Sequence, residues 1–238
     1  MTRAHLVEAR DVAKSFGQTP ALRGASVAIR AGEIFAVMGP SGSGKSTLLH
    51  CLAGIFAPDR GEVWFDGERL DTLGEAERTR LRRTAFGFVF QFGQLVPELT
   101  AADNVALPLL LNRVRRRVAY GTAETWLGRL GIGDKGANRT GELSGGEAQR
   151  VAVARALALA PKVIFADEPT GSLDSLTGEK VMDLLTALAR EAGTTVVIVT
   201  HDARVAAYAD RVVMVRDGLV SGDLGAVGEQ VSAAKAGR

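Results

Sequence analysis

The sequence has a single cysteine and lacks any long apolar run. Cys51 cannot form an internal disulfide, so a reducing compartment is the simplest expectation. The longest apolar stretches, such as VVIV at residues 196–199, are far shorter than the ~20 residues that a membrane helix needs. The N-terminal stretch MTRAHLVEARDV mixes charged and apolar side chains and has no apolar segment typical of a secretory signal. We expect a chain that does not span a membrane, although it can still dock on a membrane protein.

The chain also has almost no excess charge of either sign. It contains 29 Lys plus Arg against 27 Asp plus Glu, so its formal net charge is only +2. Nucleic-acid binding usually requires a clear basic excess, so we expect no nucleic-acid partner. The basic run RVRRR at residues 113–117 could contact nucleic acid or lipid headgroups, but a solvated helical face is the simpler interpretation. His5 and His50 have no neighbouring ligands at metal spacing, so no zinc site is predicted.

The order of the apolar segments predicts an α/β fold. Of the 238 residues, 46% are hydrophobic, enough for one large domain with a real core. Short strands bounded by glycines are expected at 6–12, 25–29, 34–38 and 62–65. Apolar strands that alternate with helices, a pattern typical of a parallel sheet covered on both faces, are expected at 86–90, 163–166, 196–200 and 211–215. Helices dominate from about 91 to 161.

The most informative segment is GPSGSGKST, which follows the apolar run IFAVM. Gly39, Gly44, Lys45 and Ser46 fit the phosphate-loop pattern G-x-x-x-x-G-K-[ST]. Glycines let backbone N–H groups point inward, and the helix start adds a positive dipole end. Lys45 would contact the β- and γ-phosphates, and Ser46 would hold Mg²⁺. A flexible turn is the alternative, which the strand–loop–helix context disfavours. We expect the whole loop to bind nucleotide: Gly39, Pro40, Ser41, Gly42, Ser43, Gly44, Lys45, Ser46 and Thr47.

Acidic and polar groups follow three other apolar strands. Asp167 ends the run VIFAD, as expected for a carboxylate that reaches Mg²⁺ directly or through water. Glu168 follows at once and could polarise a water for attack on the γ-phosphate. Gln91 follows FGFVF and His201 follows VVIVT, where ligands bind in such sheets. A solvated strand end is the alternative for each, weakened here by the apolar strands and the phosphate loop.

The segment LSGGEAQRVAVARAL, residues 143–157, adds a family resemblance. With GPSGSGKST, VIFADEP and the histidine after an apolar strand, the chain resembles the ATP-binding subunit of an ABC transporter over about residues 6–220. The resemblance implies a P-loop NTPase core with a mainly parallel sheet, an N-terminal antiparallel β subdomain and an inserted helical subdomain. On this basis the ATP-binding domain covers 1–222, its helical subdomain about 92–161, and a loosely ordered tail 223–238.

The resemblance also implies roles for particular residues. Two subunits of this family pair head to tail, and the phosphate loop of one and the LSGGE segment of the other enclose ATP. The residues of that segment here are Ser144, Gly145, Gly146 and Glu147. Phe16 would stack on adenine, Asp174 would lie at the dimer contact, and Gln91 would touch Mg²⁺ or the attacking water. Glu168 matches the catalytic base, and His201 matches the histidine that contacts the γ-phosphate. Asp167, Ser46 and Gln91 would hold Mg²⁺.

The segments FVFQFGQLVPELTAADNVALPLLL and DEPTGSLDSLTGE resemble one subclass in particular. It contains lipoprotein-releasing, macrolide-exporting and cell-division ABC systems, whose membrane permeases have few helices and an external domain. The resemblance implies a place on the cytoplasmic face of the membrane, a permease partner and an ATP-bound homodimer. Two alternatives stay open: a cell-division type of regulator that moves no solute, and an ABC protein without a membrane partner.

Overall fold

The computed structural model describes residues 5–223 and divides the chain into two compact units. The first unit combines residues 1–79 with 195–238, and the second consists of residues 80–194. Each unit has its own strands and its own buried apolar side chains. The tail expected at 223–238 lies, apart from residue 223, outside the described residues.

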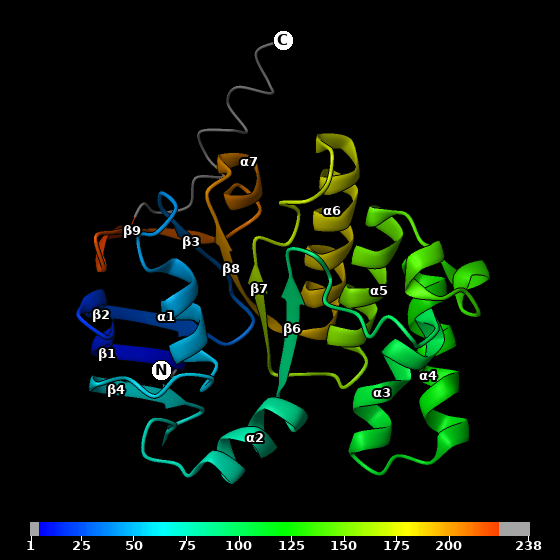
Figure 1. The fold of residues 1–238 in the computed structure, drawn as a ribbon, viewed down its shortest axis with the longest axis horizontal. Coiled ribbons are helices and arrows are strands. Elements are labelled where there is room, and N and C mark those ends of the chain that lie inside the picture. The colour runs from blue at the N-terminus through cyan, green and yellow to red at the C-terminus, as the bar shows by residue number, and fades with distance from the viewer. Residues whose placement is uncertain (1–4, 224–238) are drawn as a thin grey trace. The chain divides into compact units, whose positions relative to one another are not determined.

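An antiparallel sheet forms the N-terminal part of the first unit. Its strands are β1 (His5–Phe16), β2 (Thr19–Arg30), β4 (Arg60–Phe65) and β5 (Glu68–Arg69), in the order β2-β1-β4-β5. Figure 1 shows β1, β2 and β4 side by side in blue and cyan. Gly17, with φ +60°, makes the tight turn between the two long strands. One face of the sheet is buried, which agrees with the alternating apolar pattern.

The remaining strands of the first unit include the strand that leads into the glycine-rich loop at residues 39–47. They are β3 (Ile34–Met38), β8 (Thr195–Thr200), β9 (Arg211–Arg216) and β10 (Leu219–Asp223), in the order β10-β9-β3-β8. Strand β3 is parallel to β8 and β9, and β10 is antiparallel to β9. Every residue of β8 is buried, as expected for a parallel strand that is covered on both faces. The helices of this unit are α1 (Lys45–Leu52) and α7 (Ala203–Ala206), and α1 packs against β1, β2, β4 and β8.

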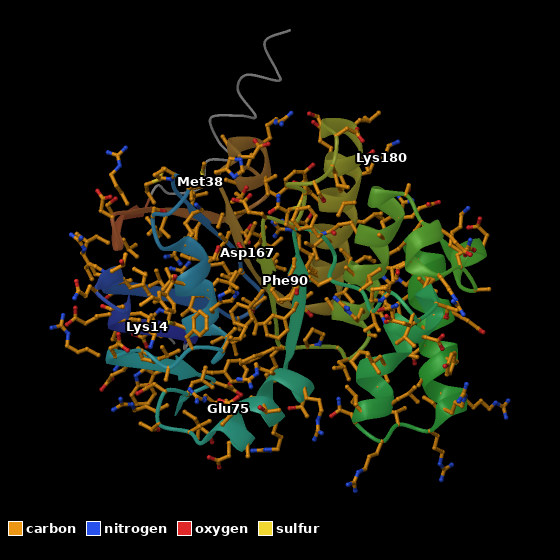
Figure 2. The ribbon with its side chains drawn as sticks, viewed as in Figure 1. Lys14, Met38, Glu75, Phe90, Asp167 and Lys180 are labelled. Atoms are coloured by element: carbon orange, nitrogen blue, oxygen red, sulfur yellow. The ribbon has the colours of Figure 1, made fainter. Side chains whose placement is uncertain are left out.

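The second unit contains two parallel strands, β6 (Phe86–Phe90) and β7 (Val163–Asp167). Their register pairs Phe90 with Asp167, the last residues of the two strands. Both residues are labelled in Figure 2, at neighbouring strand ends. Because parallel strands end at the same edge, the residues that follow β6 and β7 emerge close together.

Helices make up most of the rest of the second unit. They are α3 (Ala101–Leu111), α4 (Arg116–Arg129), α5 (Gly145–Leu157) and α6 (Ser175–Ala192), with short 3₁₀ turns at Gly133–Lys135 and Thr140–Glu142. Helices α3, α4 and α5 pack on one another, and α5 also packs on β6 and α6. Side-chain caps fix the starts: Thr100 and Asp103 form a capping box on α3, and Asp174 caps α6. Helix α2 (Glu75–Thr84) joins the two units.

The predicted α/β fold is confirmed, with an antiparallel N-terminal sheet, parallel core strands and helices α3–α5 inserted between β6 and β7 in chain order. Cys51 is 1% exposed, and burial raises the pKa of its thiol to about 12, as befits a small apolar group in a core. None of the helices within residues 5–223 has both the length and the apolar character for crossing a membrane.

Candidate functional site

The loop between β3 and α1 follows a backbone path that only glycine adopts readily at two of its positions. Gly39 and Gly44 have φ angles of +152° and +104°, in the region that disfavours residues with a side chain. A Cβ atom at Gly39 would overlap the carbonyl oxygen of Val215, and one at Gly44 would overlap that of Ala21. The two glycines of the pattern are therefore required for the path of the loop itself.

Two side chains in this loop hold polar groups in buried positions. Lys45 and Ser43 are 7% and 5% exposed. The Lys45 Nζ donates a 2.8 Å hydrogen bond to the carbonyl oxygen of Pro40 and so turns back over the loop. Within the described residues, the Ser43 Oγ is buried and has no hydrogen-bond partner. A buried ammonium and an unsatisfied buried hydroxyl in one loop fit an anionic ligand rich in oxygen acceptors, such as a phosphate chain.

The start of α1 adds a second attraction for an anion. Gly44 is the N-cap, and no side chain from the part of the chain that the structure describes caps this end. Uncapped N–H groups at a helix start, together with the helix dipole, form an anion-binding site. The loop residues on either side of Ser43 and Lys45 are exposed or partly exposed to solvent: Pro40, Ser41, Gly42, Ser46 and Thr47.

Phe16 and His201 are the other predicted residues in the first unit. Phe16 ends β1, is 49% exposed, and meets Phe56 edge to face with 5.5 Å between ring centroids. Phe56 meets His50 of α1 in the same manner at 5.2 Å. This cluster holds Phe16 beside α1 with part of its ring exposed, as stacking on a base requires. His201 is exposed and directly follows β8.

The acidic pair lies in the second unit, at the end of β7. Asp167 is the last residue of the strand, Glu168 follows it, and both are half-buried. Glu168 has φ +47°, a left-handed backbone conformation that costs a residue with a side chain about 1–3 kcal/mol. Such strain persists only where the surrounding structure enforces it, and it is concentrated at functional sites.

Gln91 directly follows β6 and contacts the segment that follows Glu168. The Ser172 hydroxyl donates a 2.7 Å hydrogen bond to the carbonyl oxygen of Gln91. A Cβ atom at Gly171 would lie 2.8 Å from the Gln91 Nε2, so the glycine leaves room for the glutamine side chain. The structure therefore brings Gln91, Asp167 and Glu168 together at one edge of the β6–β7 pair.

The LSGGE segment forms the start of α5. The Glu147 carboxylate accepts a 2.8 Å hydrogen bond from the Ser144 N–H, and the Ser144 Oγ accepts a 3.3 Å bond from the Glu147 N–H. Hydrogen bonding of the carboxylate to the Ser144 N–H, and next to the Ser144 side chain, lowers the pKa of Glu147. This capping box uses the N–H groups of Ser144 and Glu147 within the chain, so an incoming anion would meet those of Gly145 and Gly146.

Asp174 lies close to this segment. Its carboxylate caps α6 by accepting a 3.0 Å hydrogen bond from the Thr177 N–H. Hydrogen bonding to the Thr177 side chain, and next to its backbone, lowers the pKa of Asp174. Gly146 is buried, and a Cβ atom there would overlap the Thr177 Cγ2. The starts of α5 and α6 thus touch, and this contact places Asp174 beside the LSGGE segment.

The Gly146–Thr177 contact can be tested by substitution. Gly146→Ala is expected to destabilise the protein by about 1–3 kcal/mol, because the new methyl group overlaps that of Thr177. Thr177→Ser removes the opposing methyl group and leaves the backbone cap in place, so the double variant should regain most of the loss. The free energy of unfolding in urea measures both effects. Equal instability of the single and double variants would contradict the proposed overlap.

The sequence motifs predict no role for Gln149, yet this residue contacts the ends of the same strands. It is 2% exposed and donates hydrogen bonds to the carbonyl oxygens of Phe90 and Pro169. Gly146, Gln149 and Val153 recur at helical spacing and are all buried, so they share one face of α5. A polar residue on an otherwise apolar helix face is the signal that could have identified it.

The predicted metal ligands are a hydroxyl, an amide oxygen and a single carboxylate. No cluster of three or more His, Cys, Asp or Glu side chains suited to a metal ion occurs in residues 5–223. The loop geometry, the buried lysine and the acidic strand end define the class of protein: a P-loop nucleotide-binding protein.

Comparisons with known proteins extend this assignment. The family model described as ABC transporter matches residues 22–171. The lipoprotein-releasing system ATP-binding protein LolD of Paramagnetospirillum magneticum is 49% identical over 199 residues, which cover 84% of this chain and 88% of that protein. The macrolide export ATP-binding/permease protein MacB of Marinobacter nauticus is 43% identical over 230 residues, 95% of this chain and 36% of that protein.

A solved structure agrees with the sequence comparisons. It is a dimeric ATP-binding cassette in a post-hydrolysis state bound to ADP and Pi, with a TM-score of 0.84 and 40% identity, covering 92% of this chain and 98% of that one. The chain belongs to the ABC transporter family, as an ATP-binding subunit with ATPase activity.

Proposed function

We propose that this chain is the ATPase subunit of a lipoprotein-releasing ABC transporter. Two copies bind two Mg²⁺·ATP, hydrolyse them and drive a membrane permease that releases lipoprotein on the far side of the membrane. The observation that carries the proposal is the 49% identity to a lipoprotein-releasing ATP-binding protein, over 88% of that protein's length. The dimeric state of the solved relative supports the pairing of two copies.

Under this proposal, different residues of the chain bind the phosphates, bind the adenine and activate the attacking water. Residues 39–47 bind the phosphates, Lys45 lies on the β- and γ-phosphates, and Phe16 stacks on the adenine. Glu168 takes the proton of the attacking water, and His201 contacts the γ-phosphate. From the other copy, Gly145 and Gly146 offer their N–H groups to the same nucleotide.

Mg²⁺ fits the donor set that the sequence predicts. Ser46, Gln91 and Asp167 would supply hydroxyl, amide and carboxylate oxygens, the hard ligands that this cation prefers. When bound, the cation neutralises charge that develops on the phosphates. Asp174, next to the LSGGE segment of its own chain, would take part in the contact between copies.

We further propose that residues 1–222 act as one ATP-binding domain with a helical subdomain at about 92–161. The permease would hold the domain at the cytoplasmic face of the membrane, through the segment after Gln91 and the helical subdomain. It would be of the type with few membrane helices and a large external domain.

Co-purification tests this proposal. The tagged Glu168→Gln variant is expressed in the organism that encodes it, the membranes are solubilised with Mg²⁺·ATP present, and the bound proteins are identified. A few-helix permease carrying lipid-modified protein is the expected result. A many-helix permease, or a few-helix permease with a different cargo, would overturn lipoprotein release. A partner without any membrane segment would overturn the transport function. The same preparation without ATP is the control.

A further inference from the structure

Helix α5 carries two side chains that hold the backbone segments next to Gln91 and Glu168. The first is Gln149, whose Nε2 donates a 2.9 Å hydrogen bond to the carbonyl oxygen of Phe90 and a 2.6 Å bond to that of Pro169. Phe90 directly precedes Gln91, and Pro169 directly follows Glu168. One amide group therefore joins the two chain segments that carry the proposed metal ligand and the proposed base.

The chemistry of this link admits few replacements. A primary amide has two N–H donors on one nitrogen, and Gln149 uses that nitrogen for both carbonyl oxygens. The side chain is 2% exposed, so water does not readily take its place. A carboxylate of the same shape would present only acceptors to two carbonyl oxygens, and a thioether would offer no donor at all.

The second side chain is Arg155, further along the same helix. Its guanidinium donates a 2.7 Å hydrogen bond to the carbonyl oxygen of Gly93 and a 2.8 Å bond to that of Gln94, in the segment just after Gln91. Burial lowers the pKa of Arg155, but a guanidinium stays charged at physiological pH. Its fork of donors fixes two successive carbonyl groups at once, which a lysine cannot do.

The start of the same helix is the LSGGE segment, which touches α6 through Gly146 and Thr177. A short α-helix moves as a rigid body. The LSGGE segment, the backbone around Gln91 and the turn at Glu168 are therefore attached to one element.

We propose that Gln149 and Arg155 are positioning residues for ATP hydrolysis, which set the placement of Gln91 and Glu168 relative to the start of α5. The inference rests on the proposed function of Gln91 and Glu168. When the LSGGE segment binds the nucleotide of the other copy, the same helix keeps Gln91, the metal ligand, and Glu168, the base, at fixed positions relative to that segment. Loss of either link slows the chemical step without weakening the binding of the nucleotide.

Steady-state kinetics of the full-length chain test the inference. Gln149→Met keeps the size of the side chain and removes both donors, so kcat is expected to fall about 10- to 100-fold, the size of effect that small misplacements of reacting groups produce. The Kd for Mg²⁺-free ATP should stay within about twofold, because the binding loop at residues 39–47 is unchanged.

A second pair of variants covers the case in which Gln149→Met fails to fold. Arg155→Lys keeps the charge and one donor, whereas Arg155→Met keeps neither. The expected order of kcat is wild type, then Arg155→Lys, then Arg155→Met, again with little change in the Kd for ATP.

Val153→Ala is the matched control, because it removes buried apolar atoms from the same face of the same helix but no hydrogen bond to either backbone segment. It should lower the melting temperature and leave the kcat of the folded protein unchanged. Wild-type kcat in Gln149→Met and Arg155→Met would overturn the positioning role, as would an equal loss of kcat in Val153→Ala. Turnover by Glu168→Gln at the wild-type rate would instead refute the function of Glu168, so the two failures are distinguishable.

Discussion

ATP turnover by the Glu168→Gln variant is expected to fall about 10²- to 10⁴-fold, the usual contribution of a general base. Glu168 follows the apolar strand β7, next to Asp167, and is half-buried there. The amide that replaces its carboxylate cannot accept a proton from the attacking water. It keeps the size of the side chain, so ATP should bind as in the wild type. With hydrolysis blocked, two copies should stay paired around the nucleotide.

Three measurements check this result: kcat, the Kd for ATP, and the apparent mass on gel filtration with Mg²⁺·ATP. Glu124→Gln is the matched control, since Glu124 is exposed on α4 and the same change in charge occurs away from the strand ends. The control should keep wild-type turnover and should not accumulate dimer. If Glu168→Gln hydrolyses ATP at the wild-type rate, another group must act as the base.

Lys45→Ala is expected to lose about 10- to 100-fold in ATP affinity, because hydrogen bonds to charged groups contribute about 1.5–3 kcal/mol when buried. Lys45 is 7% exposed, and its ammonium lies within the loop, on the carbonyl oxygen of Pro40. An alanine leaves the glycine-determined path of the loop unchanged. The loss should therefore appear in binding and leave the unfolding free energy nearly unaltered.

Isothermal titration with ATP in the absence of Mg²⁺ isolates this effect, since the cation then contributes nothing. Lys180→Ala is the control. Lys180, labelled in Figure 2, is exposed on α6 and is far in sequence from the phosphate-binding loop at residues 39–47. It should bind ATP as the wild type does. Unchanged affinity in Lys45→Ala would refute a phosphate-binding role for the lysine.

Much of the fold follows from local sequence features. The run IFAVM and the wholly buried TVVIVT are strands where their β-branched residues predict them. The strand–glycine–helix order around Lys45 predicts both the conformation and the chemistry of the loop.

Other elements depend on side-chain ion pairs or on tertiary packing, which a short stretch of sequence does not reveal. Helix α2 has no buried residue and no apolar period, and it is supported by local pairs such as Arg78 with Glu75 at 2.8 Å. Helix α3 continues through Pro108, where local rules predict a helix end, because Val105 and Leu109 are buried in the packing of the unit.

The hydrogen bonds that Gln149 and Arg155 make could not be predicted from sequence motifs either. Both side chains bond to backbone carbonyl oxygens, and every residue type has such an oxygen. Three of the four partners, Phe90, Gly93 and Gln94, are also 59 to 62 positions away in sequence, and Pro169 is 20 positions away. Only the packing of α5 against the β6–β7 edge reveals them.

The left-handed backbone of Glu168 has a consequence for protein engineering. Glycine and asparagine tolerate φ +47° better than glutamate does, so either replacement should relieve strain and raise the melting temperature. Both replacements also remove the carboxylate. A screen of this protein for heat resistance alone would therefore enrich variants at position 168 that are more durable and catalytically inactive, and directed evolution would have to select for turnover at every round.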